Sequence, residues 1–318
     1  MIIAVVGGSG FIGTRLTRRL LDSGHDVRIL DKKQSSTFPK RWLYADVTKE
    51  ESILSGLTGC SVIYNLAAEH HDNVRPKSLY YKVNVEGART LCSAAEQLGI
   101  ERIIFTSSVA VYGFSNKEID EADVPKPVND YGKSKLEAER VYLAWQQRRQ
   151  GRILTIVRPT VIFGEANRGN VYNLFQQLQS RSFLMVGNGR NVKSMAYVEN
   201  LSAFLEYALR FDVGVQVFNY VDKPDLDMNN LVSFFRNETR QNKQIAFRLP
   251  FIVGYTAGLF FDFLGFIIRK KFPISTMRII KFCSMSQFSS RNLAETGFLP
   301  PLTLYEGLRR TIRNEFPS

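Results

Sequence analysis

Apolar and polar positions alternate with two different periods near the start of the chain. Residues 2–6 (IIAVV) form an unbroken apolar, β-branched run, which is typical of a strand buried on both faces. From Phe11 to Leu21 the apolar residues instead recur at helical spacing. The string GGSGFIG joins the two stretches. The pattern predicts a strand, a glycine turn and an amphipathic helix, in that order.

The same alternation continues through the first half of the chain. Strands that alternate with helices form parallel sheets through right-handed crossovers. The sequence therefore predicts an α/β fold, a Rossmann-type doubly wound parallel sheet with a smaller, mainly helical C-terminal substrate domain. The further strands are predicted at 26–31, 61–68, 102–108 and 152–159, and helices at 79–97 and about 130–149.

Two domains are expected from this order of elements. The nucleotide-binding domain takes residues 1–164 and about 194–221. The substrate-binding domain takes residues 165–193 and 222–318, including an apolar segment at 249–272. No internal repeat and no long linker separates them.

The glycine turn has the spacing of a dinucleotide site. Gly7 permits the tight bend, Gly10 lets the backbone approach a pyrophosphate, and Gly13 lets the helix pack close to the strand. The helix N-terminus then directs its partial positive charge at the phosphates.

An acidic residue after the second strand supports this interpretation. Asp31 ends that strand, about 20 residues after the turn, where a carboxylate accepts hydrogen bonds from the adenosine ribose hydroxyls. A carboxylate there also repels a 2′-phosphate, so the pattern favours NAD over NADP. Lys32 and Lys33 follow directly and soften that preference.

Three polar side chains are predicted to converge on one site. In DYGKSKLEAE, Tyr131 and Lys135 lie four residues apart, and therefore on one face of a helix. Ser108 lies just beyond the carboxyl end of a predicted strand, where open α/β sheets bind ligands. A lone Tyr and Lys at this spacing is usually a surface pair. Beside the glycine turn and Asp31, a catalytic site is the better interpretation.

These residues resemble the extended short-chain dehydrogenase/reductase family, the branch with nucleotide-sugar 4-epimerases and dehydratases, over essentially the whole chain. The resemblance implies that Tyr131 is the acid/base, that Lys135 lowers the pKa of Tyr131 and holds the nicotinamide ribose, and that Ser108 bonds the reacting oxygen. It also implies that Asn84 supports the lysine. The cofactor contacts that it implies, besides Tyr131 and Lys135, are Gly7, Gly10, Phe11, Ile12, Gly13, Asp31, Asp46, Val47, Leu66, Ala67, Ala68, Asn84 and Pro159.

The ordinary acidity of tyrosine agrees with the role implied for Tyr131. A phenol has a pKa near 10, so it becomes a base near neutral pH only beside cations that favour the phenolate. Lys135 and oxidised nicotinamide are the cations that the resemblance supplies.

Later strings narrow the resemblance to bacterial 4-epimerases of N-acetylglucosaminyl-diphospho-undecaprenol in O-antigen synthesis. The strings are NLAAEHHDNVRPKSLYYKVNVEGA, RPTVIFGEANRGNVYNLFQQ, GNGRNVKSMAYVENL and FNYVDKPDLDMNNLV. The implied reaction is reversible inversion at C4. Tyr131 removes the hydroxyl proton, hydride passes to NAD, and the 4-keto sugar turns over before hydride returns to its opposite face.

One position departs from the soluble UDP-sugar epimerases. Their arginine for the diphosphate corresponds here to Lys193, a point charge without the bidentate fork. No uracil-binding pattern is evident either, which favours a diphosphate without a nucleoside. Arg168 and Asn170 are further candidate anchors, and His70 is a candidate substrate contact. His71 is a candidate substrate contact as well, and so is Arg75, for which a surface salt bridge is the more common role.

Charge and cysteine content narrow the expected partners, the possible metal or disulfide sites and the compartment. A formal charge of +12 suggests an anionic partner, but no nucleic-acid-binding motif accompanies it. The three cysteines are far apart and in no metal-ligand spacing, so neither disulfides nor a metal site is expected. The apolar start is too short for a signal peptide core, and the cytosol is the expected compartment.

The segment GLFFDFLGFIIRKKF (258–272) does not fit a soluble enzyme easily. Asp262, the glycines and Pro250 argue against a membrane-spanning helix. Either the segment is a buried helix or dimer surface, or its exposed part lies on the cytoplasmic leaflet of the inner membrane. In the second case, Arg269, Lys270 and Lys271 meet anionic lipid headgroups.

Two alternatives to a lipid-linked sugar epimerase stay open. The first is a soluble UDP-N-acetylhexosamine 4-epimerase or a nucleotide-sugar 4-ketoreductase. The second is a dinucleotide-sensing regulatory protein, although such proteins commonly lack the Tyr131 and Lys135 pair that is present here. A homodimer through helices beside the sheet is plausible from the resemblance.

Overall fold

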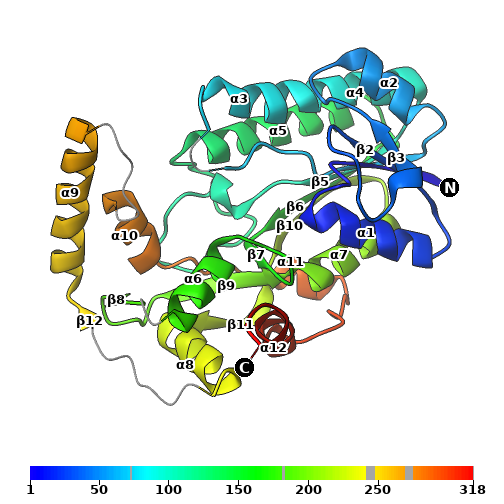
Figure 1. Ribbon diagram of the computed structural model, residues 1–318. Coiled ribbons are helices and arrows are strands. Elements are labelled where there is room, and N and C mark those ends of the chain that lie inside the picture. The colour runs from blue at the N-terminus through cyan, green and yellow to red at the C-terminus, as the bar shows by residue number, and fades with distance from the viewer. Residues whose placement is uncertain (72–73, 181–182, 241–247, 269–274, 318) are drawn as a thin grey trace.

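Residues 2–159, together with a last strand from the second half of the chain, build one parallel sheet (Figure 1). The computed structural model describes residues 1–71, 74–180, 183–240, 248–268 and 275–317. The seven strands of the sheet are all parallel and stand in the order β10-β6-β5-β4-β1-β2-β3. The prediction of a doubly wound Rossmann-type sheet is confirmed. The strands are β1 (Ile2–Val6), β2 (Asp26–Asp31), β3 (Trp42–Tyr44), β4 (Val62–Asn65), β5 (Arg102–Thr106), β6 (Ile153–Pro159) and β10 (Gly214–Tyr220).

Helices cover both faces of this sheet, which explains the unbroken apolar run of β1. Ala4 and Val6 face one core and Ile3 and Val5 face the other, because successive side chains of a strand point to opposite faces. The first core lies under α2 (Glu50–Leu57), α4 (Gly87–Leu98) and α5 (Asp130–Gln147), and the second under α1 (Phe11–Asp22) and α7 (Val198–Tyr207).

The helix predicted at 79–97 is interrupted. α3 (Ser78–Tyr81) passes into a π-helical turn, Lys82–Glu86, before α4 begins. Asn84 lies in that turn and bonds to two other segments through its side-chain amide. A π-turn shifts the side chains after it and is frequent at functional sites, so apolar spacing alone does not reveal it.

Later residues form smaller sheets covered by helices. Strands β7 (Val161–Phe163), β9 (Val192–Tyr197) and β11 (Asp222–Asp227) make one sheet, and β8 (Met185–Val186) and β12 (Arg248–Leu249) pair beside it. A third core joins them to α6, α8 and α12. The division into two domains stays a prediction. The helices are α6 (Asn170–Gln179), α8 (Met228–Glu238), α9 (Phe251–Ile268), α10 (Thr276–Cys283), α11 (Arg291–Glu295) and α12 (Leu304–Glu315).

Helix α9 stands at the edge of the molecule, beside α10 and away from the large sheet (Figure 1). Its buried residues are Gly254 and Gly258, whereas Phe263 and Phe266 are 65% and 84% exposed. Its position excludes burial of this helix in a domain core, while a dimer surface and a membrane contact both stay open. α9 is also the one helix in the described ranges that is long and apolar enough to cross a membrane, judged by length and composition alone.

Candidate active site

The carboxyl edge of the sheet brings Ser108, Tyr131 and Lys135 together. Ser108 follows β5 and caps a short 3-10 turn, its Oγ accepting the Ala110 amide at 3.2 Å. Helix α5 begins nearby, where Asn129 Oδ1 accepts the Gly132 amide at 2.8 Å. Tyr131 and Lys135 therefore occupy its first two turns, as predicted.

Burial shifts the pKa values of the two ionisable side chains in this triad, Tyr131 and Lys135. Burial raises the pKa of the Tyr131 phenol, and a hydrogen bond with Ser108 acts in the opposite direction. Burial lowers the pKa of the Lys135 ammonium to about 7, against the opposing charge of Glu139. Lys135 Nζ donates to the Thr106 carbonyl at 2.7 Å and lies 4.3 Å from the centre of the Phe105 ring. That Lys135 lowers the pKa of Tyr131 stays a prediction.

Asn84 connects the π-turn to α5 and to the segment after β4. Its Nδ2 donates to Ser134 Oγ at 2.9 Å and to the Glu69 carbonyl at 3.1 Å, and its Oδ1 accepts the Glu69 amide at 2.9 Å. Ser134 precedes Lys135 in α5. The described hydrogen bonds of Asn84 reach Ser134 and not Lys135 itself, and support of the lysine by Asn84 stays a prediction.

The glycine turn packs tightly against the protein's own backbone. Gly7 has φ +78°, and a Cβ there would lie 2.6 Å from the Ala67 amide nitrogen. A Cβ on Gly13 would lie 2.5 Å from the Gly8 Cα. In the same turn Ser9 Oγ is buried without a hydrogen-bond partner among the described residues. A close backbone, an unpaired hydroxyl and the N-terminus of α1 together suit a pyrophosphate.

Replacing Gly7 by alanine is expected to weaken both folding and NAD binding. Gly24→Ala is the matched control, since Gly24 has φ +80° but nothing within 4 Å of an added Cβ. The control measures the cost of a left-handed backbone alone, about 1–2 kcal/mol. Thermal unfolding and calorimetric NAD titration compare the variants. Equal effects of the two substitutions would contradict the close approach at Gly7.

Two carboxylates lie where the adenosine half is expected. Asp31 accepts the Ser9 amide at 3.1 Å and the Lys33 amide at 2.9 Å. Asp46 lies 3.5 Å from Lys32 Nζ. Burial acts to raise the pKa of Asp46, but hydrogen bonds from Thr48 and the charge of Lys32 hold it below its usual value. Lys32 therefore has an acidic partner of its own.

The other predicted cofactor contacts follow strand ends or begin helices. Phe11 and Ile12 open α1, Pro159 ends β6, and 66–68 follow β4. The Ala67 amide donates to Asn65 Oδ1 at 3.1 Å, which fixes the segment beside Gly7. Val47 follows Asp46 and is buried. Their contacts with NAD stay predictions.

The predicted substrate anchors have partners within the protein. Lys193 Nζ donates to the carbonyls of Lys281 and Ser284 at 2.9 and 2.5 Å, and burial lowers its pKa to about 8. The ammonium therefore holds the C-terminal end of α10. Arg168 pairs with Glu315, and its guanidinium lies 4.2 Å from the centre of the Tyr172 ring.

The other two candidates differ in position. Asn170 opens α6. Burial lowers the pKa of His70, with smaller effects from the charges of His71 and Lys135, so His70 lies close enough to the triad to repel its lysine. The two histidine rings stack at 4.5 Å. Substrate binding by all four candidates remains untested.

Sequence reasoning missed a buried ion pair behind the triad. Glu139 is 1% exposed and accepts Arg158 Nε at 2.9 Å and Nη2 at 2.6 Å. Two signals could have found it. Glu139 lies one helical turn after Lys135, and Arg158 is a charged residue within an apolar strand, where it needs a partner.

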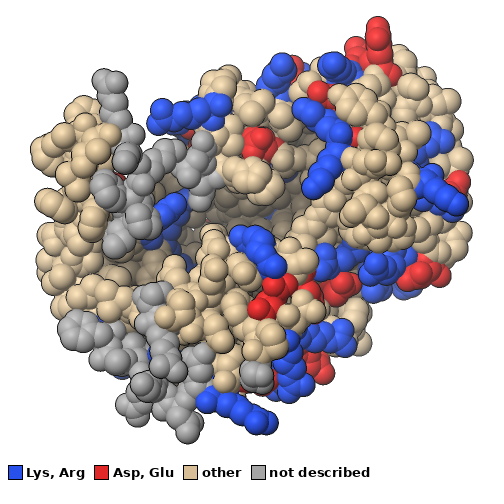
Figure 2. All heavy atoms as spheres, in the orientation of Figure 1, with Lys and Arg blue, Asp and Glu red and all other residues tan. Residues whose placement is uncertain are grey.

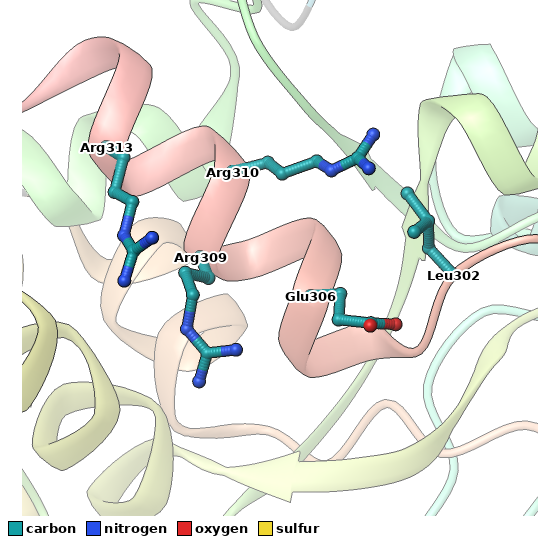
Figure 3. A pocket seen from close by; sticks show the side chains of 5 residues that line it. All are labelled: Leu302, Glu306, Arg309, Arg310 and Arg313. Carbon is teal, nitrogen blue, oxygen red and sulfur yellow. The ribbon is translucent and has the colours of Figure 1, made fainter.

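A separate cavity of about 200 Å³ lies against α12 (Figure 3). Arg309 and Arg313 point from this helix and pair with Glu238 at 2.9 and 3.6 Å. None of the predicted site residues lines the cavity, so we do not assign it to catalysis. Its lining residues are Leu302, Glu306, Arg309, Arg310 and Arg313.

The parallel sheet, the glycine turn and the Ser108, Tyr131 and Lys135 group together define a dinucleotide-dependent enzyme of the short-chain dehydrogenase/reductase class. The chain belongs to the NAD dependent epimerase/dehydratase family, which matches residues 3–220. NAD is accordingly its cofactor.

One similar protein is the N-acetyl-alpha-D-glucosaminyl-diphospho-ditrans,octacis-undecaprenol 4-epimerase of Escherichia coli O157:H7. It is 46% identical over 99% of this chain and 95% of its own length. The fold is similar to the UDP-glucose 4-epimerase of Thermus thermophilus in complex with NAD, with a TM-score of 0.77, 19% identity and 100% of each chain covered. It is also similar to the UDP-N-acetylglucosamine 4-epimerase of Bacillus cereus, with a TM-score of 0.76, 18% identity and 98% of each chain covered.

Proposed function

We propose that the protein is an NAD-dependent 4-epimerase that interconverts N-acetylglucosaminyl- and N-acetylgalactosaminyl-diphospho-undecaprenol. The observation that carries the proposal is the 46% identity, along nearly the whole chain, to an enzyme named for that activity. The position of Ser108, Tyr131 and Lys135 at the carboxyl edge of the sheet supports the same chemistry. The product serves surface polysaccharide synthesis.

Each catalytic residue has a defined part in this reaction. Ser108 Oγ and Tyr131 Oη hydrogen-bond to each other, so both can face the C4 oxygen of one sugar. NAD, when bound, supplies the acceptor and then the donor of the C4 hydride. Tyr131 Oη takes the C4 hydroxyl proton and later returns it. Lys135 stabilises the phenolate by its charge, which offsets the burial of Tyr131.

A side-by-side assay tests the substrate. We expect the purified protein with catalytic NAD to invert C4 of the polyprenyl-linked sugar in detergent, without net oxidation, and to turn over UDP-N-acetylglucosamine poorly. The C4 configuration of each product is read by NMR. Efficient turnover of the UDP-sugar alone would contradict the proposal, and consumption of reduced cofactor would indicate a ketoreductase.

We also propose that α9 lies on the cytoplasmic face of the inner membrane, where the lipid-linked substrate is held. Its outward side is mainly apolar, with the exposed Thr256 as an exception, and Ile252, Phe263 and Ile267 are exposed by 60% or more. An 18-residue helix is about 27 Å long, so this surface is extensive. Large exposed apolar surfaces mark contacts with membranes or proteins.

The acid within α9 does not oppose this arrangement. Gly254, Gly258 and Asp262 are spaced four residues apart and so share one side of the helix. A Cβ on Gly258 would lie 2.8 Å from the Thr276 amide nitrogen, and Asp262 Oδ2 accepts that amide at 3.0 Å. One oxygen of the exposed Asp262 is therefore held by the N-terminus of α10.

The same contacts favour a helix that lies on the membrane over one that crosses it. The middle of α9 packs on the N-terminus of α10, while Asn191 and Lys193 bond to the C-terminal carbonyls of α10. A crossing helix would draw α10, with Arg278, into hydrocarbon at high cost. The basic run that was expected to meet lipid headgroups, Arg269 to Lys271, lies outside the described residues.

One chain segment links this arm to the active site. This is the segment that follows α9 and α10. In it, Ser286 pairs with β9, and the Ser289 amide donates to the Ile119 carbonyl at 2.8 Å. Ile119 belongs to the loop that follows the 3-10 turn capped by Ser108. Figure 2 shows this face of the molecule hollowed between the α9 side and the sheet domain. The arrangement supports delivery of a membrane-held sugar to the site.

A further inference from the structure

A buried carboxylate joins the three segments that carry the active site. Glu139 lies on α5, one turn after Lys135, and its two oxygens are held by the fork of Arg158 at the end of β6. Ser107 Oγ donates to Glu139 Oε1 at 2.5 Å. Ser107 is the neighbour of Ser108. Helix α5, strand β6 and the loop that carries Ser107 and Ser108, here called the serine loop, therefore meet at the side chain of Glu139.

The network continues behind the serine loop. Arg158 Nη1 donates to the Tyr112 hydroxyl at 2.5 Å, and that hydroxyl donates to Asn219 Oδ1 at 2.9 Å. The Asn219 amide donates to Glu121 Oε1 at 2.7 Å. That bond comes from the Asn219 backbone amide, whereas Asn219 Nδ2 is buried without a partner among the described residues. The Glu139 carboxylate itself accepts two hydrogen bonds from Arg158 and one from Ser107, which fix its position.

Burial removes water from around the Lys135 ammonium. The Nζ atom bonds to a neutral carbonyl and lies over an aromatic ring. The titratable groups whose charges act on Lys135 or respond to it are Glu139 on α5 and His70 after β4. Of the groups in the described part of the chain, Glu139 is the one whose charge favours the ammonium.

We propose that Glu139 is a positioning residue of this active site: held by Arg158 and Ser107, its charge keeps the Lys135 amine protonated, and its hydrogen bonds fix the serine loop against α5. The proposal rests on the role of Lys135 in the proposed function, but not on which sugar is the substrate.

The sign of the expected effect follows from the charges. Burial favours the neutral amine and Glu139 favours the ammonium. Removing the negative charge should move the Lys135 pKa further below about 7. At a pH above the Lys135 pKa, each unit by which that pKa decreases reduces the protonated fraction of the amine about tenfold. Activity at pH 7.5 should fall by the same factor, recover at lower pH, and show an alkaline limb displaced to lower pH.

The direct test is NMR titration of lysines labelled with ¹³C at Cε, in the protein without NAD or substrate. Glu139→Gln keeps the shape of the side chain and removes its charge. We expect the Lys135 resonance, assigned by its loss in Lys135→Met, to titrate at lower pH than in the wild type. The pH profile of kcat is the second readout. A role limited to holding the fold would lower stability without moving either titration.

Three further variants separate charge from architecture. Glu137→Gln removes a charge from the same helix and should leave the Lys135 titration unchanged. Arg158→Lys keeps the positive charge but loses the fork, so it should lower the unfolding temperature without displacing the titration. If Glu139→Gln fails to fold, combining it with Arg158→Gln avoids leaving the Arg158 charge buried without its partner. The double variant should show a smaller decrease in the same direction.

One result would overturn the proposal. If Lys135 titrates at the same pH in folded Glu139→Gln, or in the folded double variant, as in the wild type, Glu139 does not set its charge. Because the titration needs no substrate, this outcome is distinct from a failure of the proposed epimerase activity. An inactive wild type with a displaced Lys135 titration in Glu139→Gln would refute the function and retain the network.

Discussion

Replacing Tyr131 with phenylalanine is expected to lower kcat for C4 inversion by about 10²–10⁴-fold, the usual contribution of a positioned acid or base. The substitution removes one hydroxyl, which hydrogen-bonds with Ser108, and leaves the ring that packs 6.4 Å from Tyr80. The fold should therefore be retained. Turnover of the polyprenyl-linked sugar and thermal unfolding measure the two effects separately.

The matched control is Tyr81→Phe. Tyr81 is the last residue of α3. Its hydroxyl makes a long hydrogen bond of 3.4 Å to Asp130, at the start of α5. We expect little change in turnover from this variant. If Tyr131→Phe also turned over normally, catalysis through this site would be untenable. A dinucleotide-sensing protein would then be the better interpretation.

Removing two apolar side chains from the outward side of α9 should release the protein from membranes. Phe263 and Ile267 are 65% and 60% exposed. Inserting such side chains into an apolar phase is worth about 1.5–3 kcal/mol each. Phe263→Ser with Ile267→Ser should therefore weaken partitioning onto anionic vesicles by about 10²–10⁴-fold. Vesicle sedimentation measures the bound fraction.

Equally exposed residues elsewhere provide the control for this experiment. Val124 and Val213 are 72% and 61% exposed and lie outside α9, so serine there should leave partitioning unchanged. Unchanged binding of the α9 variant would contradict the membrane contact. If that variant instead turned a dimer into a monomer in sedimentation velocity, α9 would be the dimer surface that the sequence also allowed.

The short-range features of the protein were predictable from sequence. β1, the glycine turn and the start of α5 lie where the pattern placed them. The apolar period depends on which faces of an element are buried, and a left-handed residue such as Gly7 needs glycine whatever surrounds it. Such signals are complete within a few residues, and the family follows from them.

Features that depend on distant partners were not predictable. Lys193 was predicted to anchor a diphosphate, which stays a prediction; the bonds of its ammonium to carbonyls about 90 residues later in the chain were not predictable. The π-turn at 82–86 follows from what Asn84 contacts across the fold. Apolar spacing in the sequence contains no information about either contact.

The sequence by itself predicted the class of fold and the dinucleotide turn, because periodicity and glycine geometry are local properties of the chain. Through the family resemblance it also indicated NAD and a catalytic triad, and the catalytic roles of the triad stay a prediction. The tertiary structure decided two further matters. It placed the apolar side of α9 outside the cores, with Asp262 turned towards α10. It also set Glu139 between Arg158 and Ser107, behind Lys135. Both depend on which surfaces meet after folding, and composition alone does not specify this.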